Sequence, residues 1–131
     1  MAKMEITFPG NKRVNALLNG MEIKTDQPVA AGGDSSAPSP FELFLASLGT
    51  CAGIFALSFF ENRKLSMEGF NMSLDFKWNR EKHLLEKVEI SMTLPKDFPE
   101  KYVPALKSAV DLCLVKRTLA EPPAFETIVK R

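Results

Sequence analysis

A long apolar stretch in the first half of the chain lies between segments in which polar and apolar residues alternate. Residues 43–60 carry no charged side chain, and a loop rich in glycine and serine precedes them. Ser39, Pro40 and Glu42 have the pattern of a capping box, with serine at the N-cap, proline at the first helical position and glutamate at the third. The pattern predicts a helix from Pro40 to about Asn62.

The same stretch is long enough to be weighed as a membrane span. Small and polar residues interrupt it, Glu42 and Glu61 bound it, and the segments around it read as strands with one apolar face to cover. These features favour a buried helix of a soluble protein without a membrane partner, and a small membrane protein stays as an alternative. So long an apolar helix needs more cover than one small domain offers, so a second copy of the chain is expected to supply it.

Alternation with a period of two marks the expected strands. Residues 70–78 alternate strictly, and residues 88–94 do so as well. The polar residues 79–83 between them predict the turn of an antiparallel hairpin. His83 lies in this charged turn, where we expect it to be exposed and not catalytic.

Shorter runs complete the pattern. Residues 5–8, 14–18 and 21–25 predict an N-terminal β-meander, and residues 125–130 predict a strand that closes a sheet. Between the hairpin and this last strand, apolar residues recur at helical spacing and place Cys113 on the inward face of a second helical region; they are Val103, Leu106, Val110 and Cys113. The fold class is therefore α+β, in a single domain over residues 1–131.

Composition and charge exclude several partners. The chain has 131 residues, 45% of them hydrophobic, with 17 basic and 16 acidic side chains spread along it. Because no basic stripe is present, nucleic acid is not an expected partner. The N-terminus lacks the apolar core of a signal peptide, so we expect a cytoplasmic protein whose cysteines stay reduced.

Only two cysteines are present, Cys51 in the apolar stretch and Cys113 far downstream. Their separation excludes a C-x-x-C redox motif, and two thiols with one histidine are too few for a closed zinc site, so we expect neither a metal nor a cofactor. The thiols either react or are inert, and Cys113 by itself fits an inert buried thiol.

Two segments resemble the OsmC/Ohr family: residues 38–43 through Cys51, and residues 113–119. The resemblance covers essentially the whole chain in order. It implies an OsmC-like fold in an intertwined homodimer with active sites at the subunit interface. Characterised members reduce organic hydroperoxides with a peroxidatic and a resolving cysteine, and dihydrolipoyl groups on proteins serve some of them as the external dithiol reductant.

The resemblance also implies residue roles. Cys51 would attack the peroxide and Cys113 would resolve the intermediate. An apolar setting alone raises a thiol pKa, so Cys51 needs a nearby cation or hydrogen-bond donors. In the family an arginine from the N-terminal sheet, held by a glutamate, fills this need; Arg13 is the only arginine before Cys51, and Arg117 is its rival.

Glu42 has two possible roles. In the first, it is the third helical residue of the capping box and has no catalytic function. In the second, it serves the site around the Cys51 of a partner chain. Nine positions separate it from Cys51, which places the two on opposite sides of a straight helix. For the chain as a whole we expect a thiol peroxidase of oxidative-stress defence, and the alternative is a non-enzymatic small-molecule binding or carrier protein on the same dimeric scaffold.

Overall fold

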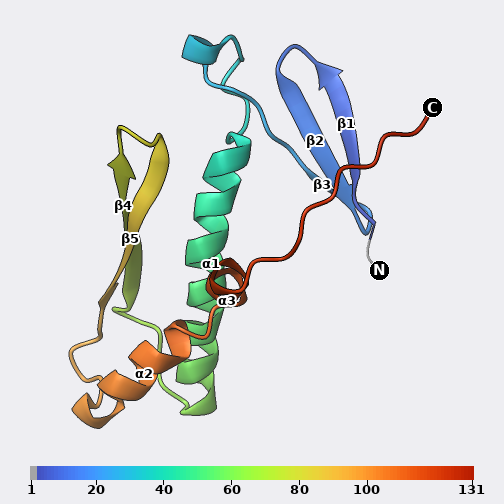
Figure 1. The fold of residues 1–131 in the computed structure, drawn as a ribbon. Helices are drawn as coiled ribbons and strands as arrows, with labels where there is room; N and C mark the ends of the chain where they lie inside the picture. The colour runs from blue at the N-terminus through green and yellow to red at the C-terminus, as the bar shows by residue number, and fades with distance from the viewer. Residues whose placement is uncertain (1–2) are drawn as a thin grey trace. The chain divides into compact units, whose positions relative to one another are not determined.

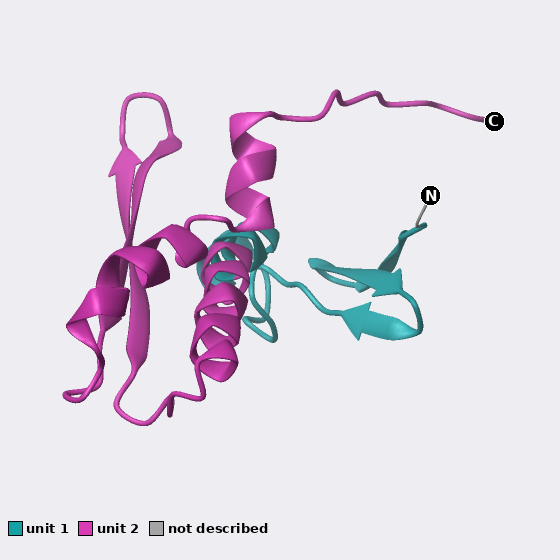
Figure 2. Cartoon of the chain, turned by 90° about the horizontal axis from the view of Figure 1, so that it is seen from below, with its two compact units in different colours: residues 1–46 teal, residues 47–131 magenta. Residues whose placement is uncertain are grey.

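The computed structural model describes residues 3–131, and the chain divides into two compact units, up to Ala46 and from Ser47 onward (Figure 2). The boundary falls inside the long helix α1 (Pro40–Asn62). The single domain expected over residues 1–131 stays a prediction.

The first unit contains a three-stranded antiparallel meander, as predicted. Its elements are β1 (Glu5–Gly10), β2 (Arg13–Leu18), β3 (Met21–Ile23) and the short 3-10 helix η1 (Val29–Ala31). The register pairs Ile6 with Ala16 and Ala16 with Ile23, which brings these apolar side chains to one face. Several residues that share this face are exposed in the single chain, among them Ile6 and Met21 at 51% and 62%.

The loop between the meander and α1 is organised around the buried carboxylate of Asp26. This carboxylate accepts hydrogen bonds from the backbone N–H groups of Gln27, Asp34 and Ser36 and from the Ser36 hydroxyl. Gly33 is required by the close approach of the chain, since a Cβ there would lie 2.0 Å from the carbonyl oxygen of Gln27. The loop therefore has a defined conformation despite its glycine and serine content.

Helix α1 (Pro40–Asn62) begins and ends at the predicted residues. The capping box is confirmed: the Ser39 N–H donates to Glu42 Oε1 at 3.0 Å, and the Glu42 N–H donates to Ser39 Oγ at 3.3 Å. Each bond satisfies a donor that the helix backbone leaves without a partner.

The second unit combines α1 from Ser47 onward with a hairpin and two shorter helices (Figure 1). These elements are β4 (Asn71–Asn79), β5 (Leu84–Thr93), η2 (Glu100–Tyr102), α2 (Val103–Val110) and α3 (Leu114–Ala120). The predicted hairpin is confirmed, with β5 starting at Leu84 rather than Val88. The Lys82 N–H donates to Asn79 Oδ1 at 3.0 Å and closes the turn.

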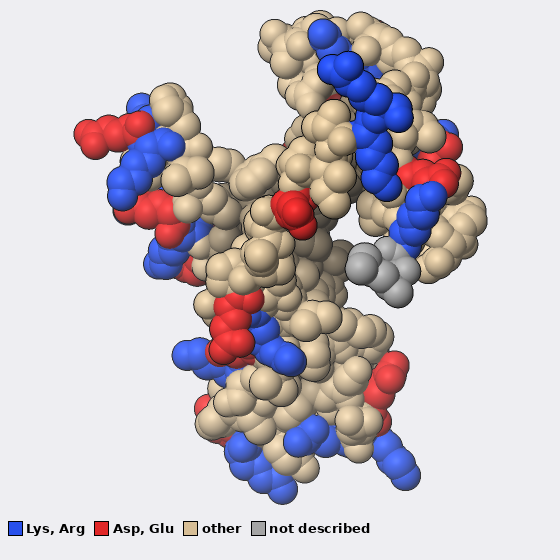
Figure 3. All heavy atoms as spheres, turned by 45° about the vertical axis from the view of Figure 1, so that its right-hand side comes forward, with Lys and Arg blue, Asp and Glu red and all other residues tan. Residues whose placement is uncertain are grey.

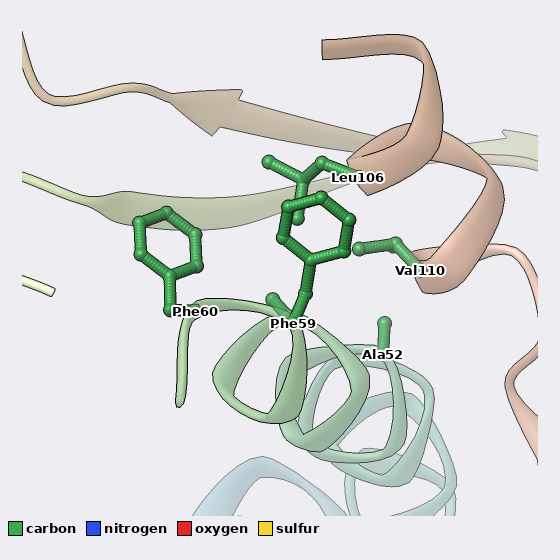
Figure 4. Close-up of a cluster of buried hydrophobic side chains, with 6 residues drawn as sticks. Ala52, Phe59, Phe60, Leu106 and Val110 are labelled. Carbon is green, nitrogen blue, oxygen red and sulfur yellow. The ribbon is translucent and has the colours of Figure 1, made fainter. Parts of the chain in front are cut away.

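The core of this unit lies where α1, the hairpin and α2 meet (Figure 4). Buried residues recur about one turn apart along α1, so a single stripe of the helix is covered. The cluster consists of Ala52, Ala56, Phe59, Phe60, Leu106 and Val110. Phe60 and Leu106 are the largest apolar contributors with almost no exposure, and burial of each side chain contributes about 1.5–3 kcal/mol.

Helix α1 is also long and apolar enough to cross a membrane by length and composition alone, and 28% of its most apolar window is buried. The core helix of a soluble protein passes the same criterion. The buried stripe packs on the hairpin and α2, while Ile54 lies on another part of the helix surface and is 53% exposed.

The expected strand at residues 125–130 is not present. Residues 122–131 form neither helix nor strand, and Phe125 and Val129 are 90% and 85% exposed. A strand needs a neighbouring edge to accept its hydrogen bonds. Within the described part of the chain, no edge pairs with this segment.

Candidate functional site: a pair of hydrogen-bonded thiols

The two cysteines meet in the second unit. Cys51 lies on α1 directly before the buried Ala52 and is half-buried, whereas Cys113 is fully buried. The Cys113 thiol donates a hydrogen bond to the sulfur of Cys51. The structure therefore brings together the two residues that the resemblance assigns to thiol chemistry, and both are free cysteines.

Cys113 reaches this position in a way that its spacing did not predict. It points inward as expected, but it does not belong to the helix of Val110: α2 ends there, and Cys113 is the N-cap of α3 with an extended backbone at φ −45° and ψ 123°. The Leu112 N–H donates to the Ala109 carbonyl at 3.1 Å and tightens the end of α2. The three-residue spacing continues through this break, so the expectation that Cys113 shares a helical face with Val110 was wrong.

The start of α3 supplies the donors that Cys51 needs. The N–H of Val115, the Cys113 thiol and the N–H of Leu114 donate hydrogen bonds that lower the pKa of Cys51, and burial opposes them only in part. Hydrogen bonds to a thiolate favour the charged form. The residue types do not reveal these donors, because nearly every residue carries a backbone N–H. The available signal was the short helical run directly after Cys113.

The second thiol has the opposite tendency. Burial raises the pKa of Cys113, and the hydrogen bond to Cys51 and the charge of that residue raise it further. The N–H groups of Lys116 and Val115 act in the other direction without cancelling this effect. Cys51 is thus the thiol that ionises first, and Cys113 holds the proton.

Arg13 is held by a loop of its own unit. Its Nη2 pairs with Asp34 Oδ2 at 2.8 Å, and its Nε donates to Ser36 Oγ at 3.4 Å. The Asn11 side-chain amide donates to the same Asp34 oxygen at 3.2 Å. In this chain the carboxylate that holds the arginine is therefore an aspartate, and a role of Arg13 at Cys51 stays a prediction.

The other two candidates have local partners. The Glu42 carboxylate is held by Ser39, whose hydrogen bonds lower the pKa of Glu42. Arg117 lies on the exposed surface of α3, and its backbone N–H donates to the Cys113 carbonyl at 3.0 Å. Catalytic roles for these two side chains stay predictions.

An apolar cavity of about 260 Å³ lies between β5 and α2. Side chains of both elements line it, with two charged residues among them: Ile90, Met92, Leu94, Val103, Leu106, Lys107, Val110 and Asp111. Among residues 3–131, no three His, Cys, Asp or Glu side chains gather in a way that could hold a metal ion.

These features define a small α+β protein with two adjoining thiols of unlike acidity. A family model described as OsmC-like protein matches residues 32–128, so the chain belongs to the OsmC-like family. A comparison with curated proteins finds no match.

Solved structures support the same fold. A Psychrobacter arcticus protein, named for osmotic stress induction and a detoxification response, has a TM-score of 0.75 and 22% identity over 90% of this chain and 88% of its own. An OsmC-like protein from Mycoplasma pneumoniae has a TM-score of 0.71 and 12% identity over 93% of this chain and 89% of its own. A Legionella pneumophila protein described as an organic hydroperoxide resistance protein has a TM-score of 0.58 and 15% identity over 91% of this chain and 88% of its own.

Proposed function

We propose that this protein is a thiol peroxidase that reduces organic hydroperoxides. The observation that carries the proposal is the contact between the two thiols, in which Cys51 is the more acidic member and Cys113 the less acidic one. A peroxidase of this kind needs one thiolate to attack and one thiol within reach to resolve. The naming of a structural relative for organic hydroperoxide resistance supports the choice of substrate class.

The proposed reaction has three balanced steps. The Cys51 thiolate attacks the terminal oxygen of the hydroperoxide; the O–O bond breaks, an alkoxide leaves and takes up a proton, and Cys51 becomes a sulfenic acid. The Cys113 sulfur then attacks the Cys51 sulfur, and a disulfide and water form. An external dithiol, such as a dihydrolipoyl group, reduces the disulfide and is itself oxidised.

Arg13 is the proposed cation for this thiolate. Its pairing with Asp34 supports the proposal, because a guanidinium fixed by a carboxylate loses less side-chain freedom when it binds a further anion. Glu42 is proposed to serve the site around the Cys51 of a partner chain.

The proposed assembly is an intertwined homodimer. Its support is the apolar surface that the single chain leaves exposed, including Ile54 on α1. Figure 3 shows broad areas of one face on which neither basic nor acidic side chains lie. Exposed apolar area of this kind is typical of an interaction surface.

Thiol counting tests the peroxidase. Reduced protein is mixed with cumene hydroperoxide, and free thiols are titrated against time. We expect the loss of two thiols per chain, no loss beyond the rate of free cysteine in Cys51→Ser, and overoxidation of Cys51 in Cys113→Ser. Wild-type thiols that react no faster than free cysteine would refute the proposal.

The cavity between β5 and α2 supports a second candidate, a small-molecule binding or carrier protein. Its volume is just below the range of common ligand sites. This alternative predicts that an apolar ligand protects the protein from unfolding while the thiols stay inert towards hydroperoxide.

A further inference from the structure

The turn that carries Cys113 is closed by an ion pair. Lys116 Nζ lies 2.8 Å from Asp111 Oδ1, and the two residues flank the cysteine in the sequence. Asp111 is the C-cap residue of α2, and its N–H donates to the Lys107 carbonyl at 3.2 Å. Lys116 lies in the first turn of α3, where its backbone N–H also donates to the Cys113 sulfur.

This pair joins the end of one helix to the start of the next. Cys113 is the N-cap of α3, and its carbonyl accepts the Arg117 N–H at 3.0 Å, so its position follows that of the start of α3. The donors to Cys51 are the N–H groups of Leu114 and Val115, which lie inside the segment that the ion pair closes. A change in the angle between α2 and α3 would therefore move the resolving thiol and both donors together.

We infer that Asp111 and Lys116 are positioning residues for the thiol pair: their ion pair sets the α2–α3 turn so that Cys113 and the N–H groups of Leu114 and Val115 face Cys51. The inference rests on the proposed function of the cysteines. The two side chains are 57% and 36% exposed, so the pair contributes little to global stability. Its effect is on local geometry, and it is measured at the thiol.

The sign of the effect separates positioning from direct electrostatics. Loss of the Asp111 charge would by charge alone lower the pKa of Cys51, and loss of the Lys116 charge would raise it. Loss of positioning raises the pKa in both cases, because both changes free the same turn. Asp111→Asn and Lys116→Gln therefore form a decisive pair of variants.

The test measures the rate of Cys51 alkylation by iodoacetamide between pH 5 and 10 in the reduced full-length protein, with the modified peptide quantified by mass spectrometry. Both variants are expected to raise the pH midpoint of Cys51 alkylation by about half a unit. At pH values below the midpoint, this shift lowers the fraction of Cys51 thiolate about threefold. The matched control is Glu89→Gln, which breaks an exposed 2.9 Å pair with Lys87 on β5 and should leave the midpoint unchanged. The exchange Asp111→Lys with Lys116→Asp should recover at least half of the shift.

Two results would overturn the inference: midpoints that move in opposite directions, or midpoints that move no more than in the control. If Asp111→Asn or Lys116→Gln melts at a lower temperature than Glu89→Gln, the exchange variant decides. An alkylation midpoint of the exchange variant that is no nearer the wild-type value than the midpoints of the two neutral variants refutes positioning. Alkylation needs no peroxide, so this outcome is independent of the proposed reaction. A wild-type protein inert to hydroperoxide, with both midpoints raised, would refute the peroxidase and leave the positioning pair standing.

Discussion

The thiol of Cys113 donates a hydrogen bond to the sulfur of Cys51, and the two groups have opposite pKa shifts. The shared hydrogen bond thus helps to make Cys51 the more acidic of the two thiols. Burial alone would raise the pKa of both thiols, so the backbone donors of α3 contribute to the lower pKa of Cys51. The asymmetry accounts for which cysteine attacks and which one resolves in the proposed reaction.

Replacement of Cys113 tests this hydrogen bond directly. Cys113→Ala removes the donor and should raise the pKa of Cys51, whereas Cys113→Ser retains a hydroxyl donor and should raise it less. The thiolate absorbance near 240 nm, followed against pH, measures both. Since the Cys51 pKa is lowered in the wild type, its absorbance should rise at a lower pH than that of a free cysteine. Equal titration curves for the two variants would contradict a role for the Cys113 donor.

Arg13 should affect activity more than stability. Its pair with Asp34 is partly exposed and contributes about 0–1 kcal/mol to the free energy of unfolding. Arg13→Gln should nevertheless slow the reaction of Cys51 with hydroperoxide at least ~10-fold, in the range expected when a charge that stabilises a reacting group is lost. Arg117→Gln is the matched comparison. If Arg117→Gln is the slower enzyme, the assignment passes from Arg13 to Arg117.

Asp26 should make the N-terminal loop sensitive to acid. The hydroxyl and N–H of Ser36, with the N–H groups of Gln27 and Asp34, lower the pKa of Asp26 to about 2. A depressed carboxyl pKa stabilises the fold above the unfolded value near ~3.9, and this stabilisation is lost as the pH falls towards about 2. Melting temperatures of wild type and Asp26→Asn should differ at pH 6 and converge towards pH 2. A constant difference over that range would show that the ionised carboxylate is not the source.

The core should tolerate little truncation. Phe60→Ala should lower the free energy of unfolding by about 3–5 kcal/mol, because a fully buried ring is lost and a cavity remains. Phe125→Ala removes the same ring from a 90% exposed position and should have almost no effect. Urea unfolding of the two variants measures the contrast.

The exposed surface of α1 provides a test of the homodimer. Ile54→Lys should convert the protein to a monomer in sedimentation analysis, because a lysine cannot be buried without a partner. Leu84→Lys changes a residue of similar exposure at the hairpin turn and should leave the assembly unchanged. A wild-type monomer at micromolar concentration would contradict the proposed assembly.

The elements with strong local signals were predictable from sequence. Helix α1 follows from its capping box and apolar length, and the hairpin follows from alternation on both sides of a polar turn. Cys113 is buried as predicted, although it does not belong to the helix of Val110. These features depend on residues close together in the chain, where propensity and periodicity act directly.

The rest depends on contacts that residue types do not encode. The break between Val110 and Cys113 left the apolar spacing intact, so only the structure shows Cys113 as the N-cap of α3. The donors to Cys51 are backbone groups, and the aspartate that holds Arg13 lies in a loop with no periodic signal. The expected C-terminal strand had the right residues and lacked a pairing edge in the described chain.

The proposed peroxidase reaction is tested most directly by treating the reduced protein with one equivalent of cumene hydroperoxide, blocking the remaining thiols by alkylation and mapping the disulfides by mass spectrometry. The proposed reaction yields one Cys51–Cys113 disulfide and one molecule of cumyl alcohol for each hydroperoxide consumed. Hydroperoxide that persists while both thiols are recovered alkylated would contradict it.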